Sequence, residues 1–164
     1  MDYLQLNSES SKIHKQRFER LVSLYETELD SHLNRKTSPE ILSKWANSMI
    51  NIQGDSDRHL EICYDANNLI GFLYGKLDHP EHRGYIKVGY GYIMEFYVLP
   101  EFRHNGYGTQ MYKHLEELLK TDGAKGLYLT SDPVTGKPFW EFMGFSYTGQ
   151  KSPENNLDIY EKEF

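Results

Sequence analysis

The chain has 164 residues, enough for one domain with a single hydrophobic core, and its apolar content of 38% excludes a disordered chain. The net charge of −6 and the lack of a basic run argue against binding to nucleic acid, and no apolar run has membrane-spanning length. One cysteine, Cys63, excludes an internal disulfide. Because no secretory signal opens the chain, we expect a cytoplasmic protein.

The first half of the chain predicts one strand, two helices and two further strands. Apolar residues recur at helical spacing in both helical segments, and Pro39 lies in the first turn of the second helix. A polar segment at 65–68 reads as a hairpin turn. The expected elements are the strand Tyr3–Leu6, a helix from about Ser11 to Leu33, a helix that starts at Thr37–Glu40, and the strands His59–Tyr64 and Leu69–Leu77.

The segment from Tyr90 to Leu99 is a nearly continuous apolar and aromatic run, which is typical of a buried central strand. Glu95 is the one charged residue inside it. Pro100 cannot donate a backbone hydrogen bond, so the strand is expected to end there. A turn with two glycines, Gly106 and Gly108, then leads into an amphipathic helix.

The rest of the chain completes an order of strand, two helices, three strands, helix, strand, helix and two strands. This order predicts a mixed α/β sheet flanked by helices, within a single domain that covers residues 1–164. The last expected elements are the strand Lys125–Thr130, the short helix Lys137–Met143, and the strands Phe145–Gly149 and Leu157–Phe164.

The glycine-rich turn before the central helix is a candidate anion site. The first N–H groups of a helix lack intrahelical partners, glycine allows a ligand to approach closely, and Arg103 adds a positive charge. No Lys-Ser/Thr follows the glycines, which excludes a P-loop, and a methionine replaces the third glycine of a dinucleotide fingerprint. A turn that only starts a helix, without a ligand, fits the same glycines.

Two motifs together carry a family resemblance. The segment Val98-Leu-Pro-Glu-Phe-Arg103-His-Asn-Gly106-Tyr-Gly108 resembles the acyl-CoA-binding signature of the GNAT N-acetyltransferase superfamily. Pro138-Phe-Trp140-Glu-Phe-Met-Gly144-Phe145 resembles the late helix of that family, which typically reads Phe-Tyr-Glu-x-x-Gly-Phe. The resemblance covers the chain well from about Asp65 to Phe164, and it implies the GNAT fold, whose mixed central sheet is mostly antiparallel.

The resemblance implies that acetyl-CoA is the acyl-donor substrate. The backbone of Phe96 and Val98 would pair with the pantetheine arm as an added strand, and a backbone N–H near Val98 could stabilise the oxyanion. Trp140 is expected to pack against the cofactor. Backbone N–H groups of the turn would hold the pyrophosphate, with the cofactor-binding residues Arg103, His104, Asn105, Gly106, Tyr107, Gly108 and Thr109.

Glu95 is the best candidate for the general base, because a carboxylate in an apolar strand is desolvated and its pKa rises. Alternation along the strand predicts that Glu95 and Tyr97 share one face, and that Tyr92, Met94 and Phe96 share the other. If the second face is the active one, Tyr92 becomes the better candidate. Glu95 could also be a purely structural or acceptor-binding carboxylate.

Trp140 departs from the family pattern, because the family commonly has a tyrosine there that protonates the leaving thiolate. An indole N–H is no practical acid, so the proton would come from water or from another tyrosine such as Tyr147. His79 and His82 have a spacing that could hold a metal, but no third ligand is indicated, and we expect no metal. Cys63 is not expected to be a nucleophile.

The sequence therefore predicts an N-acetyltransferase in which a primary amine of a small molecule, peptide or protein attacks acetyl-CoA directly while both are bound. The alternative is a non-catalytic acyl-CoA-binding module with a sensor or regulatory role, which the tryptophan at position 140 favours. Pairing of the closing strands across a homodimer is an expectation from fold-level analogy.

Overall fold

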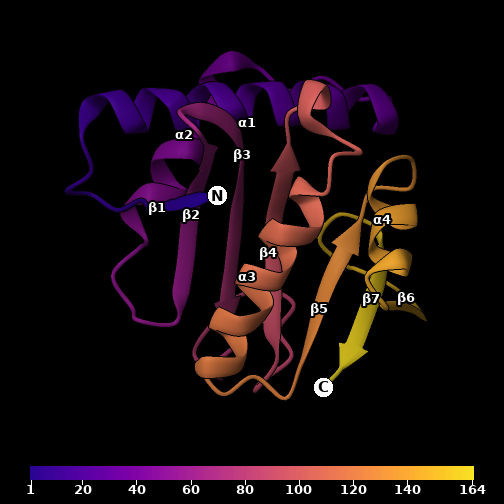
Figure 1. Cartoon of the computed structure of the whole chain (residues 1–164). Helices are drawn as coiled ribbons and strands as arrows, with labels where there is room; N and C mark the ends of the chain where they lie inside the picture. Colours follow the sequence, from indigo (N-terminus) through magenta and orange to yellow (C-terminus); the bar gives the residue numbers. More distant parts are fainter.

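A computed structural model describes residues 1–164, and its strands form one open seven-stranded sheet in the order β1-β2-β3-β4-β5-β7-β6 (Figure 1). Every neighbouring pair is antiparallel except β4 and β5. The predicted fold class and order of elements are therefore confirmed. The strands are β1 (Asp2–Gln5), β2 (Arg58–Asp65), β3 (Asn68–Leu77), β4 (Gly91–Val98), β5 (Gly126–Ser131), β6 (Ser146–Lys151) and β7 (Asp158–Glu163).

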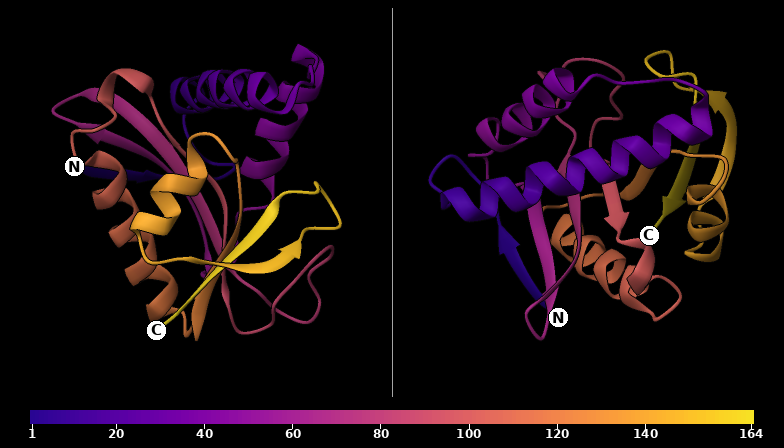
Figure 2. Two further views of the ribbon diagram at one scale, coloured as in Figure 1. Left: turned by 90° about the vertical axis from the view of Figure 1, so that its right-hand side faces the viewer. Right: turned by 90° about the horizontal axis from the view of Figure 1, so that it is seen from above.

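The helices cover both faces of the sheet, as the two views of Figure 2 show. Helices α1 (Lys12–Leu33) and α2 (Pro39–Asn51) pack on one face, and α3 (Tyr107–Thr121) and α4 (Gly136–Phe142) on the other. Each pair buries its apolar stripe against the sheet, which gives two hydrophobic cores separated by the strands. None of the helices combines the length and the apolar character needed to cross a membrane.

A β-bulge interrupts the pairing of β3 with β4. Tyr74 pairs with Glu95, and its neighbour Gly75 pairs with Ile93, so Met94 is an extra residue in β4. A bulge changes the alternation of side chains, and Met94 packs with the core on the side of α1 and α2. The predicted faces of β4 are therefore wrong in part. Phe96 and Tyr97 lie on different faces of the sheet, as expected, but Met94 lies on the same face as Tyr97.

Strands β4 and β5 pair over two positions only, Gly91 with Leu127 and Tyr92 with Tyr128. Beyond these positions the two strands separate towards their carboxyl ends, and Figure 1 shows their arrows diverging under α1. One edge of β4 is left without a neighbouring strand along most of its length. This divergence creates the space in which the candidate site lies.

Candidate active site

A cleft of about 610 Å³ opens between the diverging ends of β4 and β5. Side chains from both strands, from α1, from α4 and from the turn before α3 line it. Most of the residues that the sequence predicted for the cofactor lie on its wall: Phe96, Val98, Arg103, His104, Gly106, Gly108, Thr109 and Trp140. Asn105 and Tyr107 do not, because Asn105 bonds back to the Arg103 carbonyl and Tyr107 donates to Asp65.

The unpaired edge of β4 presents backbone groups to the cleft. The Leu99 N–H donates to the Ile70 carbonyl of β3, so backbone groups of Leu99 and Tyr97 point towards β3. Backbone groups alternate along a strand, which directs those of Phe96 and Val98 the opposite way, towards the cleft. The Val98 carbonyl accepts from Arg103, so the groups left for a ligand are the Val98 N–H and both groups of Phe96. An extended amide-containing chain in the cleft can therefore pair with β4 in the way that another strand would.

The turn before α3 carries six consecutive backbone N–H groups, from His104 to Thr109, that donate no hydrogen bond within the protein. The first N–H of the helix that does so belongs to Gln110, which donates to the Gly106 carbonyl. Gly106 has φ of 82°, a left-handed conformation that favours glycine, and a Cβ there would point into open space. The turn is thus built to receive an anion such as a pyrophosphate.

Arg103 fastens this turn to β4 and to α1. Its Nε donates to the Val98 carbonyl at 2.9 Å, and its two terminal nitrogens donate to both carboxylate oxygens of Glu28 at 2.9 and 2.7 Å. The sequence had suggested a free positive charge at the mouth. The charge is instead shared with Glu28, so the guanidinium positions the turn, and the six N–H groups are the donors that remain available to an anion.

Helix α4 is anchored by Asp132, which directly follows β5. Its carboxylate accepts from the backbone N–H groups of Val134, Thr135 and Gly136 and contacts the His32 ring of α1 at 3.1 Å. Burial acts to raise the pKa of Asp132, but the hydrogen bonds from Thr135 and the neighbouring backbone outweigh it and hold the pKa below its usual value. The carboxylate therefore fixes one wall of the cleft rather than acting as a base.

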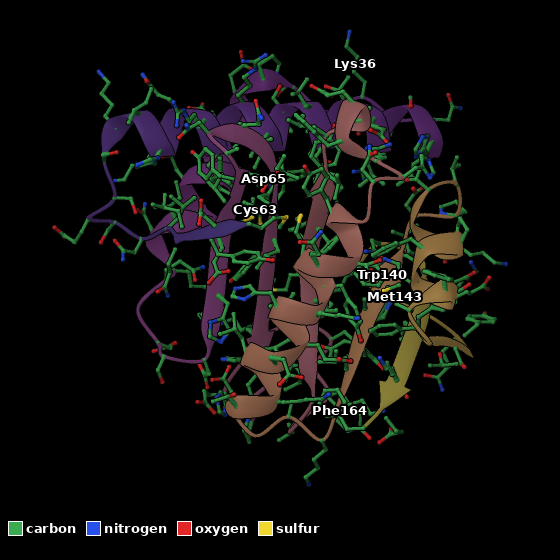
Figure 3. The ribbon with its side chains drawn as sticks, viewed as in Figure 1. Lys36, Cys63, Asp65, Trp140, Met143 and Phe164 are labelled. Atoms are coloured by element: carbon green, nitrogen blue, oxygen red, sulfur yellow. The ribbon has the colours of Figure 1, made fainter.

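Trp140 is buried in a cluster of aromatic rings at the base of α4, where Figure 3 labels it. Its ring lies 5.2 Å from that of Phe96, 5.9 Å from that of Tyr112 and 5.4 Å from that of Phe145, in edge-to-face geometry. It contributes to the wall of the cleft. These contacts agree with a packing role.

Phe139 explains the second glycine of the turn. Its ring lies so close to Gly108 that a Cβ there would come within 3.2 Å of it. Gly106 and Gly108 therefore serve different purposes: the first adopts a left-handed conformation beside open space, and the second lets α4 pack against the start of α3.

Glu95 lines a second pocket of about 380 Å³, which adjoins the cleft and shares Tyr25, Met94 and Asp132 with it. Burial is the largest cause that raises the pKa of Glu95 to about 8, and the charge of Glu26 raises it further, while Tyr25 and Arg35 act in the opposite direction. A carboxyl with this pKa can accept a proton near neutral pH. We call this second pocket the side pocket.

Tyr92 lines the side pocket together with Glu95. The prediction placed these two residues on opposite faces of the strand, and that was wrong because of the bulge at Met94. The phenol of Tyr92 has a pKa above its usual range, chiefly through burial, which makes it a poorer base than Glu95.

The structure adds residues that the sequence analysis did not single out for the site, chiefly Tyr25, Glu26, Glu28 and Arg35. The sequence did contain a signal for Glu26. Val22, Glu26 and Asp30 follow each other at four-residue spacing on the buried face of α1. Carboxylates are rarely buried unless they are paired, so Glu26 on this face indicates a special role.

Three other predicted groups lie away from the cleft. Tyr147 is exposed on β6 and packs against Tyr160, so it lines neither pocket. His79 bonds to Asp57, whereas His82 lies beside the cations of Lys76 and Arg58. Cys63 is buried in the core on the side of α3, and burial raises the pKa of its thiol.

Comparison with known proteins identifies the family of the chain. The model of the acetyltransferase (GNAT) family matches residues 18–145. No curated protein matches the sequence.

Solved structures of similar fold cover nearly the whole chain. An acetyltransferase from Thermus thermophilus is 16% identical with a TM-score of 0.71, over 100% of this chain and 98% of the other. The PaiA N-acetyltransferase from Thermoplasma acidophilum, solved with coenzyme A, is 17% identical with a TM-score of 0.67, over 99% and 98%. Tetrahymena GCN5 is 12% identical with a TM-score of 0.70, over 99% and 96%. The family model matches across the elements that build the cleft, and the chain therefore belongs to the GNAT acetyltransferase family.

Proposed function

We propose that this protein is an N-acetyltransferase that transfers the acetyl group of acetyl-CoA to a primary amine while both substrates are bound. The run of six unpartnered N–H groups from His104 to Thr109, at the mouth of a cleft with a free strand edge, is the observation that carries the proposal. Coenzyme A offers a pyrophosphate for the turn and a pantetheine arm with amides for β4. The family membership and the coenzyme A in the Thermoplasma acidophilum structure agree with this donor.

The acceptor amine is expected to enter through the side pocket, where Glu95 lies beside the cleft. An acceptor that arrives as an ammonium ion first releases one proton to solvent. The neutral amine loses a second proton as it attacks the thioester carbonyl, and Glu95 accepts that second proton. The Val98 N–H, which alternation directs into the cleft, donates to the oxygen that becomes negative in the tetrahedral intermediate.

Tyr25 is our candidate for returning the proton to the leaving thiolate. It lines both the cleft and the side pocket, and burial, followed by the nearby Glu95 carboxyl, raises the pKa of its phenol. As the C–S bond breaks and the C–N bond is retained, Tyr25 gives its hydroxyl proton to sulfur and takes the proton that Glu95 received from the amine. The products are the N-acetyl amide and the free thiol, and both side chains return to their starting states.

The alternative is a non-catalytic acyl-CoA-binding module, which the tryptophan at position 140 favours. A thiol-release assay separates the two functions. The protein is mixed with acetyl-CoA and a panel of primary amines, and free thiol is followed with a chromogenic reagent. The only cysteine of the protein, Cys63, is buried and adds little background. Amine-dependent release is expected, and binding of acetyl-CoA without release in any mixture would support the module.

A further inference from the structure

The side pocket has more acidic than basic side chains. Glu26, Glu95 and Asp132 line it, against a single guanidinium from Arg35, so the lining keeps a net negative charge even when Glu95 is protonated. Arg35 is itself divided between two carboxylates, because its Nη2 donates to Glu26 at 2.8 Å and its Nε donates to Asp30 at 2.7 Å. The guanidinium is therefore already compensated and has little attraction left for an anionic ligand.

Glu26 is a carboxylate whose burial calls for a second partner. Its residue is only 6% exposed, yet it lines the side pocket. Only its Oε2 is bonded, to Arg35, while Oε1 accepts no hydrogen bond within the protein and is not among the fully buried polar atoms. This oxygen is therefore reachable from the pocket, where it can accept a charge-assisted hydrogen bond from a bound ammonium group.

The other walls of the pocket suit an alkyl or ring-bearing cation. Tyr25, Trp45 and Tyr92 contribute aromatic rings, and Met49 and Met94 add flexible apolar surface. Trp45 is 43% exposed, although it lies on the stripe of α2 that continues the core. An exposed tryptophan at the rim of a charged pocket is suited to contact a ligand that enters from solvent.

We propose that the side pocket selects an acceptor with two positive charges, whose reacting amine meets Glu95 and whose second ammonium is held by Oε1 of Glu26. The inference rests on the proposed function and names its substrate class: a diamine or a polyamine-like cation rather than a neutral or acidic amine. The two carboxylates have separate tasks. Glu95 removes a proton from the reacting nitrogen, whereas Glu26 binds a nitrogen that remains charged throughout.

Three four-carbon amines test the proposal, because they share one reacting end and differ at the other. They are 1,4-diaminobutane, n-butylamine and 4-aminobutanoate, which present a cation, a methyl group and an anion. The expected kcat/KM of the diamine exceeds that of n-butylamine by on the order of tenfold, more than its two equivalent amines explain, and 4-aminobutanoate is the poorest substrate.

Glu26→Gln should abolish the advantage of the diamine over n-butylamine. Because the charge of Glu26 also raises the pKa of Glu95, the quantity to compare is the ratio of the two kcat/KM values in each variant. Glu19→Gln is the matched control, since Glu19 is exposed on the same helix and lines neither pocket. Equal use of the three amines by the wild-type protein, or a diamine preference that survives in Glu26→Gln, would overturn the proposal. The first of these outcomes needs no variant and is independent of any effect on folding.

Calorimetry distinguishes a failure of this inference from a failure of the proposed function. If no amine releases thiol, 1,4-diaminobutane is titrated into the protein saturated with coenzyme A. Heat of binding that is lost in Glu26→Gln and kept in Glu19→Gln supports a dication pocket in a non-catalytic protein. The absence of binding to the wild-type protein overturns the pocket assignment as well.

Discussion

The surroundings of Glu95 disfavour the charged form of its carboxyl group. Burial between β4 and α1 raises its pKa to about 8, and the carboxylate of Glu26 adds to the effect. A half-buried position of this kind stabilises the fold best when it holds an apolar or neutral side chain. The same environment gives the group a proton affinity close to that needed to deprotonate an amine near neutral pH. Stability and catalysis therefore make opposite demands on this residue.

Glu95→Gln keeps the shape of the side chain and removes the base. For the wild-type protein, kcat/KM should rise with pH through an inflection near pH 8, because only the deprotonated carboxylate accepts the proton. The variant should lose that inflection and turn over at least about a hundredfold more slowly. Its affinity for acetyl-CoA should stay close to wild type. A variant that keeps both turnover and pH profile would make Glu95 structural.

The same substitution has an effect on stability that needs no activity. Since the pKa of Glu95 in the folded protein lies above its ordinary value of 4.5, the folded state binds more protons than the unfolded chain between about pH 4.5 and 8. The contribution of Glu95 to stability thus falls as pH rises through this window. The Tm of Glu95→Gln minus that of wild type should increase from pH 5 to pH 9, whereas Glu19→Gln should show no such trend.

We expect Tyr25, and not Trp140, to protonate the leaving thiolate, so substitutions of the two residues should affect turnover differently. Trp140→Phe keeps an aromatic ring among Phe96, Tyr112 and Phe145 and loses only the indole N–H, so turnover at saturating acetyl-CoA should change little. Tyr25→Phe removes the hydroxyl and should lower kcat by on the order of tenfold or more. Trp140→Ala should weaken acetyl-CoA binding, because a large buried ring worth about 3 kcal/mol of packing is lost.

Steady-state kinetics of these variants at saturating acetyl-CoA provides the comparison. If turnover collapses in Trp140→Phe and survives in Tyr25→Phe, the indole takes part in the chemistry and the assignment of Tyr25 to the proton return is wrong. Trp140→Tyr is informative in either case, since it restores the phenol that the family commonly has. An increase in turnover would mean that the phenol reaches the sulfur.

At the scale of single elements, the start of α3 combines a backbone requirement with a binding role. Gly106 has a positive φ that costs any other residue, and its missing side chain leaves the unpartnered N–H groups open to a ligand. Gly149 provides a control within the same chain. It has the same φ of 82°, and a Cβ there would also meet nothing within 4 Å, but it lies on β6 away from the cleft.

Gly106→Val and Gly149→Val should lower the free energy of unfolding by similar amounts, because both force a branched side chain into a left-handed conformation. Only Gly106→Val should also weaken acetyl-CoA binding, by about a hundredfold, since the new side chain stands where the pyrophosphate approaches. Calorimetric Kd values for both folded variants check this. Unchanged affinity in a folded Gly106→Val protein would remove the anion-binding role of the turn.

The elements themselves could be predicted from the sequence because each has a local cause. Helical spacing of apolar residues, Pro39 in the first turn of α2 and Pro100 at the end of β4 are all local signals, and the helix and strand boundaries lie within a few residues of the expected ones. The bulge at Met94 could not be predicted, since it depends on how β4 pairs with β3. The predicted faces of Tyr92 and Met94 were wrong for that reason, whereas those of Glu95, Phe96 and Tyr97 agree with the structure.

The side pocket could not be predicted from the sequence either. It brings together Glu26 of α1, Trp45 of α2 and Glu95 of β4, which are far apart in the chain and share no motif. The donor cleft was easier, because its turn and strand end form one continuous segment from Val98 to Thr109. Sequence motifs thus pointed to the acetyl-CoA site, and only the tertiary structure places the candidate acceptor pocket beside it.

At the scale of the whole molecule, the site joins the two layers of helices. Arg103, in the turn before α3, pairs with Glu28 of α1, and Asp132, at the base of α4, contacts His32 of the same helix. These contacts cross the gap that β4 and β5 leave open. A ligand in the cleft would bridge the same elements from within, so its binding should stabilise the whole fold rather than one loop.

Coenzyme A should therefore raise the Tm of the protein. At a ligand concentration of about a hundred times Kd, binding to the folded state alone adds about 2.7 kcal/mol. For a domain of this size, each kcal/mol moves Tm by about 2–4 °C, so a shift of about 5–10 °C is expected by scanning fluorimetry.

Pantetheine, which has the arm but no pyrophosphate, should give a smaller shift at the same concentration, because it leaves the turn at Gly106 empty. In Gly106→Val, the rise in Tm with coenzyme A should fall towards the rise that pantetheine gives. Gly149→Val should have a lower Tm without ligand, but coenzyme A should raise that Tm by as much as it raises the Tm of the wild-type protein. A protein that melts at the same temperature with and without coenzyme A at millimolar concentration does not bind the cofactor in this cleft, and the proposed reaction would then have no donor.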